Sequence, residues 1–522
     1  MNATTRARVE QASARDRQQP ATKREESSAP DLRTPAPTRA VNALLVTSVL
    51  FKCLLAVFAT RFVLVDDAYI HLRYARNLVL HGEFVYNLGE PVFGLTSPLY
   101  GLITAGLYAI TGSLVEPAVL LLNIVLWTVA GWVMARRLPA STQIPTLALF
   151  LFWPSFVDNQ MLGMETPLFV LLLLLASTAA LDGRIQASAV AFGWALITRP
   201  EAILLAPCLV LAVTGLKPGI AVFGRFLNAR VLASLFGPGL AWCSFSMARY
   251  GGIIPQSMLA KSGWNSTHYD GLFTLKTSLL AIPRLTFLPF VDYLPTAITW
   301  LATGLLLIVI GAVILANVRR GSRASRNWLT FYLLYMGFYM FGKGATEASW
   351  YSIPSSVALL LASQPLLSVA WVPRSAAFHW AGAAGLVVMS TTMTLRRAPL
   401  LKSYVQGYGR SADLLNETTR GRERVLIGEI GVYGFRSEHD IIDVGALVSP
   451  QVLPMKNAGY SLCRMIRESR ASYFVISETA LETNYYPSVG DVWADADEMA
   501  WFDSCSLVGT RLDKRTFQVT QP

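Results

Sequence analysis

The sequence predicts a polytopic α-helical membrane protein with a small α/β domain at its C-terminal end. Three observations indicate this class. Of the 522 residues, 53% are hydrophobic and only 15% are charged, with a mean hydropathy of +0.43, a balance that soluble domains of this size do not show. About twelve apolar runs lie between residues 41 and 394, many of them near the length of a membrane helix. After residue 396 the composition becomes that of a soluble domain.

The first 40 residues predict a disordered cytoplasmic tail. They are rich in Arg, Glu, Ser, Thr and Pro and have almost no large apolar side chains, so they cannot bury enough surface to fold. The segment is too long and polar for a secretory signal, and the apolar run after it is too long for a signal core. The tail is therefore placed at 1–40 and the membrane domain at 41–395.

The apolar runs give the expected membrane segments. They lie at 41–64, 98–113, 117–135, 144–157, 166–181, 187–198, 201–215, 231–248, 296–317, 328–342, 354–372 and 377–394. Several are shorter than the roughly 20 residues that a perpendicular membrane helix needs.

The basic residues predict the orientation of these segments. Clusters occur at 136–137, 184, 217–230, 319–326 and 374, and the basic loops of membrane proteins are cytoplasmic. All the clusters face the cytoplasm only if residues 98–135 cross once, with one of the two runs lying along the interface or broken at its glycines. This gives about eleven crossings, with the loop 65–97 and the C-terminus outside. The formal net charge of +11 therefore reports topology and requires no nucleic-acid partner.

Residues 396–522 predict a soluble extracytoplasmic domain. They contain 15 Lys and Arg against 16 Asp and Glu. The strand-like runs VLIGEIGV, DIIDVGAL and SYFVIS, with a helical stretch at 460–469, indicate a small α/β domain. Two of the five cysteines, Cys463 and Cys505, lie here, and an oxidising compartment could join them. The sequence leaves open whether they pair.

Two adjacent carboxylates, Asp66 and Asp67, follow the first apolar run in the stretch VDDAYIHLRYARNL. Residues 68–80 have the spacing of an amphipathic helix, so one aspartate can cap the start of that helix. The other is then left over, and a carboxylate held at the membrane surface is a natural general base toward a sugar hydroxyl. From the residues alone, the capping and the catalytic roles stay equally open.

Four basic residues near the predicted outer face are candidates for binding phosphate. Arg73 and Arg76 are spaced to reach one anionic group together, and Arg holds phosphate oxygens through forked hydrogen bonds. Alternatively, their helix rests on acidic lipid headgroups. Arg199 in TRPE and Lys261 in GGIIPQSMLAKSG supply two more cations, although each could instead extend to the membrane interface.

Three further residues complete the candidate site. Glu165 in GMETPLF precedes a long apolar run, where it could cap a helix or contact a substrate. Trp350 and Tyr351 could belong to an interfacial aromatic belt or form a stacking surface for a sugar or an isoprenoid. The motifs HExxH, GxxxxGK[ST] and GxGxxG do not occur, so the sequence predicts no metal or nucleotide site of these common kinds.

These stretches together resemble a known group of enzymes. DDAYI with RYARNL, HGEFVYNLGEPVFGLTSPL, GMETPLF, TRPEA, YGGIIPQSMLAKS and IIDVGALVSP occur in this order from about residue 60 to 480. The combination resembles the polytopic GT-C glycosyltransferases, and among them most the terminal arabinofuranosyltransferases of the AftB type. The DDAYI to TSPL block is specific. One departure is IIPQSMLAKS, where many relatives have an LPNTYYAK-like run with aromatic residues.

The resemblance implies a GT-C fold and a glycosyltransferase of the bacterial inner membrane, with its active site on the extracytoplasmic face. Asp66 and Asp67 become the catalytic carboxylates, one of them the base. Arg199, Lys261 and Arg73 then stabilise the departing phosphate of a polyprenyl monophosphate donor. Side chains can neutralise a monophosphate, so no cofactor or metal is required, while the paired carboxylates keep a divalent metal open as an alternative.

The resemblance also implies arabinofuranose as the donor sugar and a glycan, lipid or protein as the acceptor. Mannose, galactofuranose and aminoarabinose remain alternative donor sugars. A lipid transporter or flippase is the alternative from another class. Transporters usually show paired halves, and no internal repeat is visible here.

Overall fold

The computed structural model describes residues 38–214, 228–262, 296–339, 349–368, 375–486 and 489–519. The tail expected at 1–40 therefore lies almost wholly outside the described residues. The same holds for most of the basic cluster at 217–230, for the cluster at 374 and for residues 263–295.

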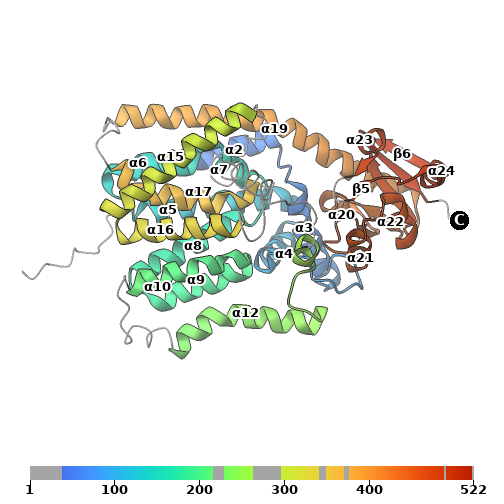
Figure 1. The fold of residues 1–522 in the computed structure, drawn as a ribbon, viewed down its shortest axis with the longest axis horizontal. Coiled ribbons are helices and arrows are strands. Elements are labelled where there is room, and N and C mark those ends of the chain that lie inside the picture. Colours follow the sequence, from blue (N-terminus) through green and yellow to red (C-terminus); the bar gives the residue numbers. More distant parts are fainter. Residues whose placement is uncertain are drawn as a thin grey trace, which may run out of the picture. The chain divides into compact units, whose positions relative to one another are not determined.

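Helices make up the first four-fifths of the described chain (Figure 1). In order they are α2 (Arg39–Leu55), η1 (Ala56–Thr60), α3 (Asp66–His81), α4 (Pro98–Thr111), η2 (Gly112–Leu114), α5 (Val115–Ala135), α6 (Ala140–Phe152), α7 (Pro154–Gln160), α8 (Thr166–Leu181), α9 (Ile185–Thr198), η3 (Pro200–Leu205), α10 (Ala206–Thr214), α12 (Ala229–Tyr250), α13 (Gln256–Ser262), α15 (Thr296–Arg320), α16 (Arg323–Gly337), η7 (Ser349–Tyr351), α17 (Ile353–Ala362), α18 (Gln364–Leu367) and α19 (Ala376–Thr418).

Several of these helices suit a lipid environment. Within the described residues, four helical segments are long and apolar enough to cross a membrane, namely Arg39–Thr60, Pro98–Ala135, Ala229–Tyr250 and Ala297–Arg320, and five shorter apolar helices accompany them. The aliphatic side chains on their outer faces stay exposed in the protein, as expected where lipid takes the place of a protein neighbour. The figure of about eleven crossings stays a prediction.

The segment 98–135 is divided into two helices with different courses. Leu95 and Thr96, just before α4, line the cavity described below, and Tyr108 near the other end of α4 packs edge-on against Phe435 of the C-terminal domain. Both ends of α4 thus lie on the side of the C-terminal domain. Only α5 runs from this side to the opposite end, where Arg137 pairs with Asp182. This course agrees with a single crossing for 98–135.

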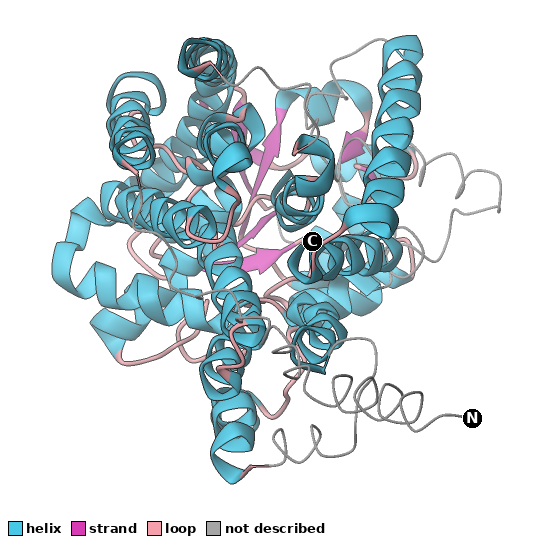
Figure 2. Ribbon diagram, turned by 90° about the vertical axis from the view of Figure 1, so that its left-hand side faces the viewer, coloured by secondary structure: helices cyan, strands magenta, loops and turns pink. Residues whose placement is uncertain are grey.

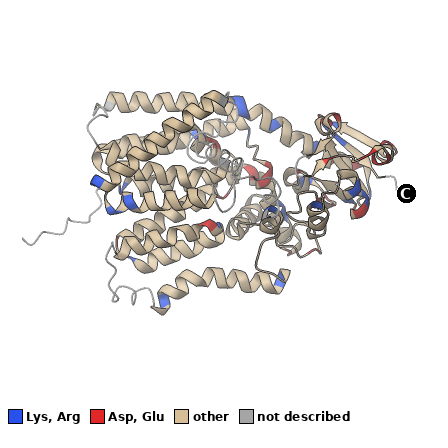
Figure 3. Cartoon of the chain, viewed as in Figure 1, with Lys and Arg blue, Asp and Glu red and all other residues tan. Residues whose placement is uncertain are grey.

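Charged residues are distributed unevenly over the helices (Figure 3). Several Lys and Arg mark the helix ends far from the C-terminal domain, whereas acidic residues of the helical part are seen mainly on the side toward that domain. Figure 2 views the molecule from the far end, with the strands behind the helices. A long helix, α19, links the two parts, and the boundary predicted at 395/396 falls inside it.

The C-terminal domain contains a five-stranded mixed sheet. Its elements are β1 (Arg424–Ile427), α20 (Gly431–Arg436), β2 (Asp440–Asp443), η8 (Pro450–Val452), α21 (Leu453–Asn457), α22 (Leu462–Ser469), β3 (Tyr473–Ser477), α23 (Glu478–Thr483), β4 (Tyr485–Tyr486), β5 (Gly490–Asp491), α24 (Ala496–Asp503), β6 (Ser506–Arg511) and β7 (Lys514–Gln518). The strand order is β2-β1-β3-β7-β6. Strand β1 pairs in parallel with β2 and β3, and β7 pairs antiparallel with β3 and β6.

The three strands and the helix predicted in this domain are present, but VLIGEIGV is a strand only as far as Ile427, and its last two residues, Gly431 and Val432, begin α20. The antiparallel strands β6 and β7 were not predicted, although residues 506–518 hold two short runs around a turn. Cys463 and Cys505 are both buried, and neither is part of a disulfide. The disulfide considered from the sequence is therefore not formed.

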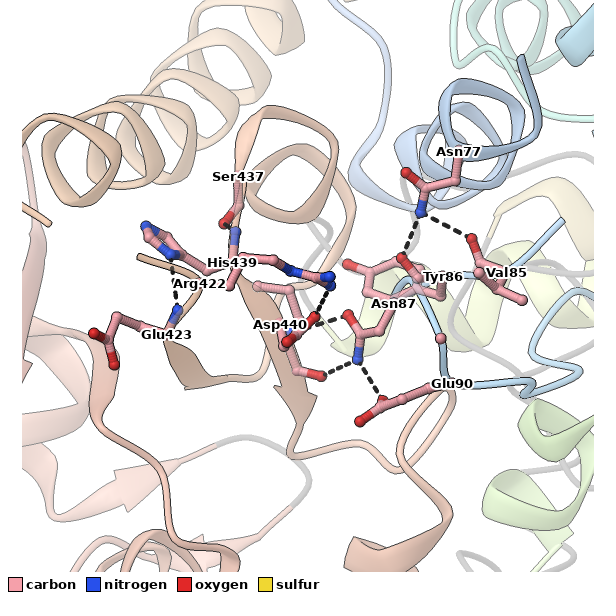
Figure 4. A network of polar contacts seen from close by, with 12 residues as sticks. Asn77, Val85, Tyr86, Asn87, Glu90, Arg422, Glu423, Ser437, His439 and Asp440 are labelled. Carbon is pink, nitrogen blue, oxygen red and sulfur yellow. Dashed lines mark hydrogen bonds and ion pairs between the residues drawn. The ribbon is translucent and has the colours of Figure 1, made fainter. Parts of the chain in front are cut away.

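The loop between α3 and α4 is held between its own helix and the C-terminal domain (Figure 4). The Asn77 side chain donates to the carbonyls of Val85 and Tyr86 at 3.0 and 2.9 Å. The Asn87 amide pairs with the backbone of Ile441 on β2, donating to its carbonyl at 2.9 Å and accepting from its N–H at 3.0 Å. These bonds fix the loop on the edge strand of the sheet.

Candidate active site

A cavity of about 490 Å³ lies where the helical part meets the C-terminal domain. Its walls come from α3, the residues before α4, the turn before α8, the start of η3, α13, η7 and the turn after β2. Six of the nine residues predicted from the sequence line it, namely Asp67, Glu165, Arg199, Lys261, Trp350 and Tyr351. Three others, Asp66, Arg73 and Arg76, are not among its lining residues.

The close approach of the turn before α8 to α3 depends on Gly163. This residue has a φ of +80°, and a Cβ there would lie 3.0 Å from Leu64 and 3.2 Å from Ala68. Glycine adopts this conformation without strain. The turn can therefore bring Glu165 against the start of α3. Glu165 makes no capping hydrogen bond with its side chain, so its carboxylate is available to the cavity.

Arg199 is a buried cation with a free edge. Its Nη2 lies 3.2 Å from Glu201, its Nη1 lies 3.6 Å from Glu165, and its guanidinium lies over the Tyr351 ring at 4.6 Å. Glu201 and Tyr351 thus hold the group in position. Nη1 forms no hydrogen bond within the described residues, and a buried donor without a partner is costly. It is therefore suited to an anionic ligand.

Lys261 supplies a second cation from α13. This short helix is anchored at Gln256, whose N–H donates to the Phe93 carbonyl at 2.6 Å and whose side-chain amide donates to the Ala446 carbonyl at 3.1 Å. The loop before α4 and the C-terminal domain thus both set the position of Lys261. Burial alone would lower the pKa of Lys261, but Tyr351 and Asp67 outweigh it and raise that pKa. Lys261 is charged at neutral pH.

The two adjacent aspartates point in different directions. Asp66 accepts hydrogen bonds from the N–H groups of Gly431 and Val432, at 2.7 and 2.9 Å, and so binds the start of α20. Asp67 lines the cavity and makes no hydrogen bond or ion pair within the described part of the chain. Neither one caps α3, whose N-cap is Val65.

The surroundings of the two carboxylates also differ. Burial raises the pKa of Asp67, Lys261 and His71 pull it back down, and Glu165 raises it. Burial, followed by the neighbouring Glu429 carboxylate, raises the pKa of Asp66 to about 8 against the effect of its two backbone hydrogen bonds. Asp67 is therefore the carboxylate that faces the cavity, near Lys261, whereas Asp66 docks the start of α20.

Arg73 and Arg76 contact backbone carbonyls, in place of the phosphate expected from the sequence. Arg73 donates to the carbonyls of Gly434 at 2.6 Å, Tyr86 at 3.0 Å and His439 at 3.1 Å, and also to that of Ser437. Arg76 donates to the Phe435 carbonyl at 2.7 Å. Together with Asp66, these arginines hold both ends of α20 against α3.

Two parts of the cavity wall were not predicted. His71 lines the cavity one helical turn after Asp67, and the i, i+4 spacing on α3 was the signal that could have found it. The turn after β2 contributes Leu447 and Val448. Asp443 shapes that turn, because its carboxylate accepts from the N–H groups of Gly445 at 2.7 Å and Val448 at 3.2 Å, and from that of Leu447.

The described residues contain no group of three or more His, Cys, Asp or Glu side chains arranged to hold a metal ion. The same cavity is lined by the Asp67 carboxylate, which has no hydrogen bond or ion pair among the described residues, by the cations Arg199 and Lys261, and by the aromatic rings of Trp350 and Tyr351. Such a site can remove a proton from one group and stabilise negative charge on another.

Comparisons with known proteins identify the fold. Residues 399–519 match a family described as a domain of unknown function, DUF8728. No curated protein matches the sequence. The crystal structure of ArnT from Cupriavidus metallidurans bound to undecaprenyl phosphate is 14% identical, covering 92% of this chain and 98% of that chain, with a TM-score of 0.61. Its apo structure is 13% identical, with coverages of 91% and 98% and a TM-score of 0.59.

A third structure, the Archaeoglobus fulgidus oligosaccharyltransferase tethered with an acceptor peptide, is 12% identical, covers 87% of this chain and 71% of that chain, and has a TM-score of 0.48. The assignment of the fold rests on the two ArnT structures, because each match covers almost the whole of this chain and of the ArnT chain. The predicted fold class, a polytopic helical protein of the GT-C fold with a small C-terminal sheet domain, is confirmed.

Proposed function

We propose that this protein is a membrane glycosyltransferase that moves a sugar from a polyprenyl monophosphate to an acceptor hydroxyl. The observation that carries the proposal is the cavity that the Asp67 carboxylate, which has no partner among the described residues, lines together with the cations Arg199 and Lys261. The fold shared with ArnT supports the same class of reaction, because one of the ArnT structures holds undecaprenyl phosphate.

The proposed reaction is a displacement at the anomeric carbon. Asp67 accepts the proton of the acceptor hydroxyl, whose oxygen forms the new bond to that carbon. The bond from the anomeric carbon to the phosphate oxygen breaks, and its electron pair leaves with the polyprenyl phosphate. Arg199 and Lys261 stabilise the charge that grows on this phosphate, as fixed dipoles and cations do for other oxyanions. Two side-chain cations suffice for a monophosphate, so the proposal involves no metal ion.

The apolar side of the cavity supports a lipid-borne donor. Ile203, Met258 and Phe338 line the cavity and are also exposed on the protein surface. They connect the cationic end with the apolar face of the helices, where the first isoprene units can lie. Trp350 and Tyr351 add aromatic surface next to Arg199.

We propose arabinofuranose as the sugar, on the strength of the sequence resemblance, and an active site that opens to the extracytoplasmic side of the bacterial inner membrane. Mannose and aminoarabinose are the alternative sugars within the same chemistry. The acceptor is a glycan, lipid or protein that presents a hydroxyl at the membrane surface.

The test is turnover by the purified full-length protein in lipid nanodiscs. Short-chain polyprenyl phosphates carrying labelled arabinofuranose, mannose or aminoarabinose are incubated with the protein and a cell-envelope glycan fraction. The proposal expects the label to move from lipid to glycan with one sugar, and expects the transfer to be lost in Asp67→Asn. A protein that moves the labelled lipid between the leaflets of a vesicle without ever releasing the sugar is a transporter, and that result would reject the proposal.

A further inference from the structure

His71 is a buried histidine of the cavity wall that the proposed reaction does not use. Only 5% of its surface is exposed, and it lies among the residues that line the cavity. Neither ring nitrogen forms a hydrogen bond within the described residues. Buried polar atoms are nearly always paired in folded proteins, and leaving one unpaired costs about 1–3 kcal/mol. Two such atoms on one ring beside a cavity indicate a ligand that pairs with them.

The surrounding residues keep the imidazole in place. Its ring packs edge-on against Tyr100, with ring centroids 5.4 Å apart and an interplanar angle of 83°. Tyr100 is itself fixed, because its hydroxyl donates to the Gly163 carbonyl at 2.8 Å and contacts Asn123 at 3.2 Å. Gly163 belongs to the turn that carries Glu165. The histidine is thus positioned on the same wall as Glu165.

The imidazole is neutral at physiological pH. Burial lowers the pKa of His71, against the Glu165 and Asp67 carboxylates and the backbone of Asp67, all of which raise it. A neutral imidazole offers one donor and one acceptor. A sugar hydroxyl offers the same combination, whereas a phosphate oxygen offers acceptors only.

The position of Glu165 indicates which part of the substrate lies here. One carboxylate oxygen of Glu165 is 3.6 Å from Arg199, while the other is buried and has no hydrogen bond within the described residues. A phosphate bound by Arg199 places the sugar attached to it next to Glu165 and His71. A wall with a carboxylate and a neutral imidazole disfavours a second anion, but it can hold hydroxyl groups.

We infer that His71 binds a hydroxyl group of the sugar being transferred and thereby helps select the donor. The inference rests on the proposed function, because it assumes a sugar-phosphate donor. It adds a residue that recognises the sugar, separate from Asp67, which removes the acceptor proton, and from the two cations that hold the phosphate. A site built to hydrogen-bond a substrate hydroxyl discriminates strongly against the analogue that lacks it.

The experiment combines changes in the residue with changes in the substrate. The donor is the polyprenyl-phosphate sugar that the wild-type protein turns over, together with the forms of that sugar that lack one hydroxyl each. The expected result is that kcat/KM of the wild type falls by about 10²-fold or more for one deoxy donor. In His71→Phe, kcat/KM for the complete donor falls by a similar factor, and that deoxy donor is no longer distinguished.

Matched variants separate recognition from folding. His81 lies on the exposed end of the same helix, and His81→Phe should behave as the wild type. His71→Asn and His71→Gln, which keep a donor and an acceptor, should recover part of the lost rate. Binding of the sugar-free polyprenyl phosphate should be unchanged in His71→Phe, which also shows that this variant is folded. Should it fail to fold, the Asn and Gln variants take its place in the comparison of donors.

Two results would overturn the inference. One is an equal penalty for the His71 variants on the complete donor and on every deoxy donor, which indicates a structural role. The other is unchanged kcat/KM in His71→Phe. Both leave the proposed function intact if the wild type transfers sugar. A wild-type protein that turns over none of the sugar donors refutes the proposed function itself, and the inference with it.

Discussion

The different roles of the two adjacent aspartates can be tested by exchanging one oxygen for an amide nitrogen in each. Asp67→Asn removes the proposed proton acceptor and leaves the side-chain volume unchanged. A positioned general base contributes about 10²–10⁴ in rate, which is about 2.7–5.5 kcal/mol of transition-state stabilisation. The variant should therefore retain at most about 1% of wild-type turnover, with unchanged stability.

Asp66→Asn should instead weaken the docking of the C-terminal domain and retain sugar transfer. Both carboxylate oxygens of Asp66 accept from backbone N–H groups, at 2.7 and 2.9 Å, whereas an amide has only one accepting oxygen. One N–H of α20 then faces a donor, at a cost of about 1–3 kcal/mol in the docking of the C-terminal domain. Activity should fall only as far as docking is weakened.

The assays are sugar transfer and hydrogen exchange over residues 424–440, measured on the same nanodisc preparations. Asp67→Asn should show lost transfer and native exchange, and Asp66→Asn faster exchange with substantial transfer. If Asp66→Asn abolishes transfer while its exchange and thermal stability match the wild type, the assignment of the base to Asp67 is wrong.

Three further predictions follow from the same contacts. Gly431→Ala places a Cβ 1.8 Å from the Asp66 carbonyl oxygen, so the C-terminal domain should become sensitive to proteolysis at protease concentrations that leave the wild type intact. Because burial and Glu429 raise the pKa of Asp66 from 3.8 to about 8, the folded state holds a proton that the unfolded chain releases. The free energy of unfolding should therefore fall as the pH rises from about 4 to about 8. The Tm of Glu429→Gln should depend less steeply on pH over this range than the Tm of the wild type. A wild-type Tm that rises with pH would contradict the buried environment of Asp66. Lys261 lowers the pKa of Asp67, so Lys261→Met should move the acidic limb of the pH–rate profile to higher pH by about one unit or more. An unchanged limb would show that Lys261 does not act on the group that titrates in catalysis.

Much of the candidate site could be predicted because its residues lie in short local patterns. Asp67, Glu165 and Arg199 each stand at the junction of a polar stretch and an apolar run, where ionisable groups are rare enough to indicate function. Lys261 follows a Gly- and Pro-containing turn after a membrane helix. These junctions fix which residues lie at the same end of the helices, and the cavity is built at that end.

The roles of Asp66 and Arg73 could not be obtained in this way. The partners of Asp66 are backbone N–H groups 365 and 366 residues later in the chain. Apart from the Tyr86 carbonyl, the partners of Arg73 are carbonyls of the same distant segment. Backbone groups carry no sequence signal, so an aspartate that binds them is indistinguishable in the sequence from one that faces a substrate. The first evidence for the difference is the docking of α20 onto α3.

The amino-acid sequence by itself determined that the chain is a helical membrane protein with an α/β domain, because hydrophobicity and its period are local properties of the chain. It also determined which end of the helices carries the ionisable groups. Only the tertiary structure decided which aspartate faces the cavity, that His71 stands beside it, and that Leu447 and Val448 of the C-terminal domain close its wall. The physical reason is that the direction of a side chain depends on the distant backbone packed against it.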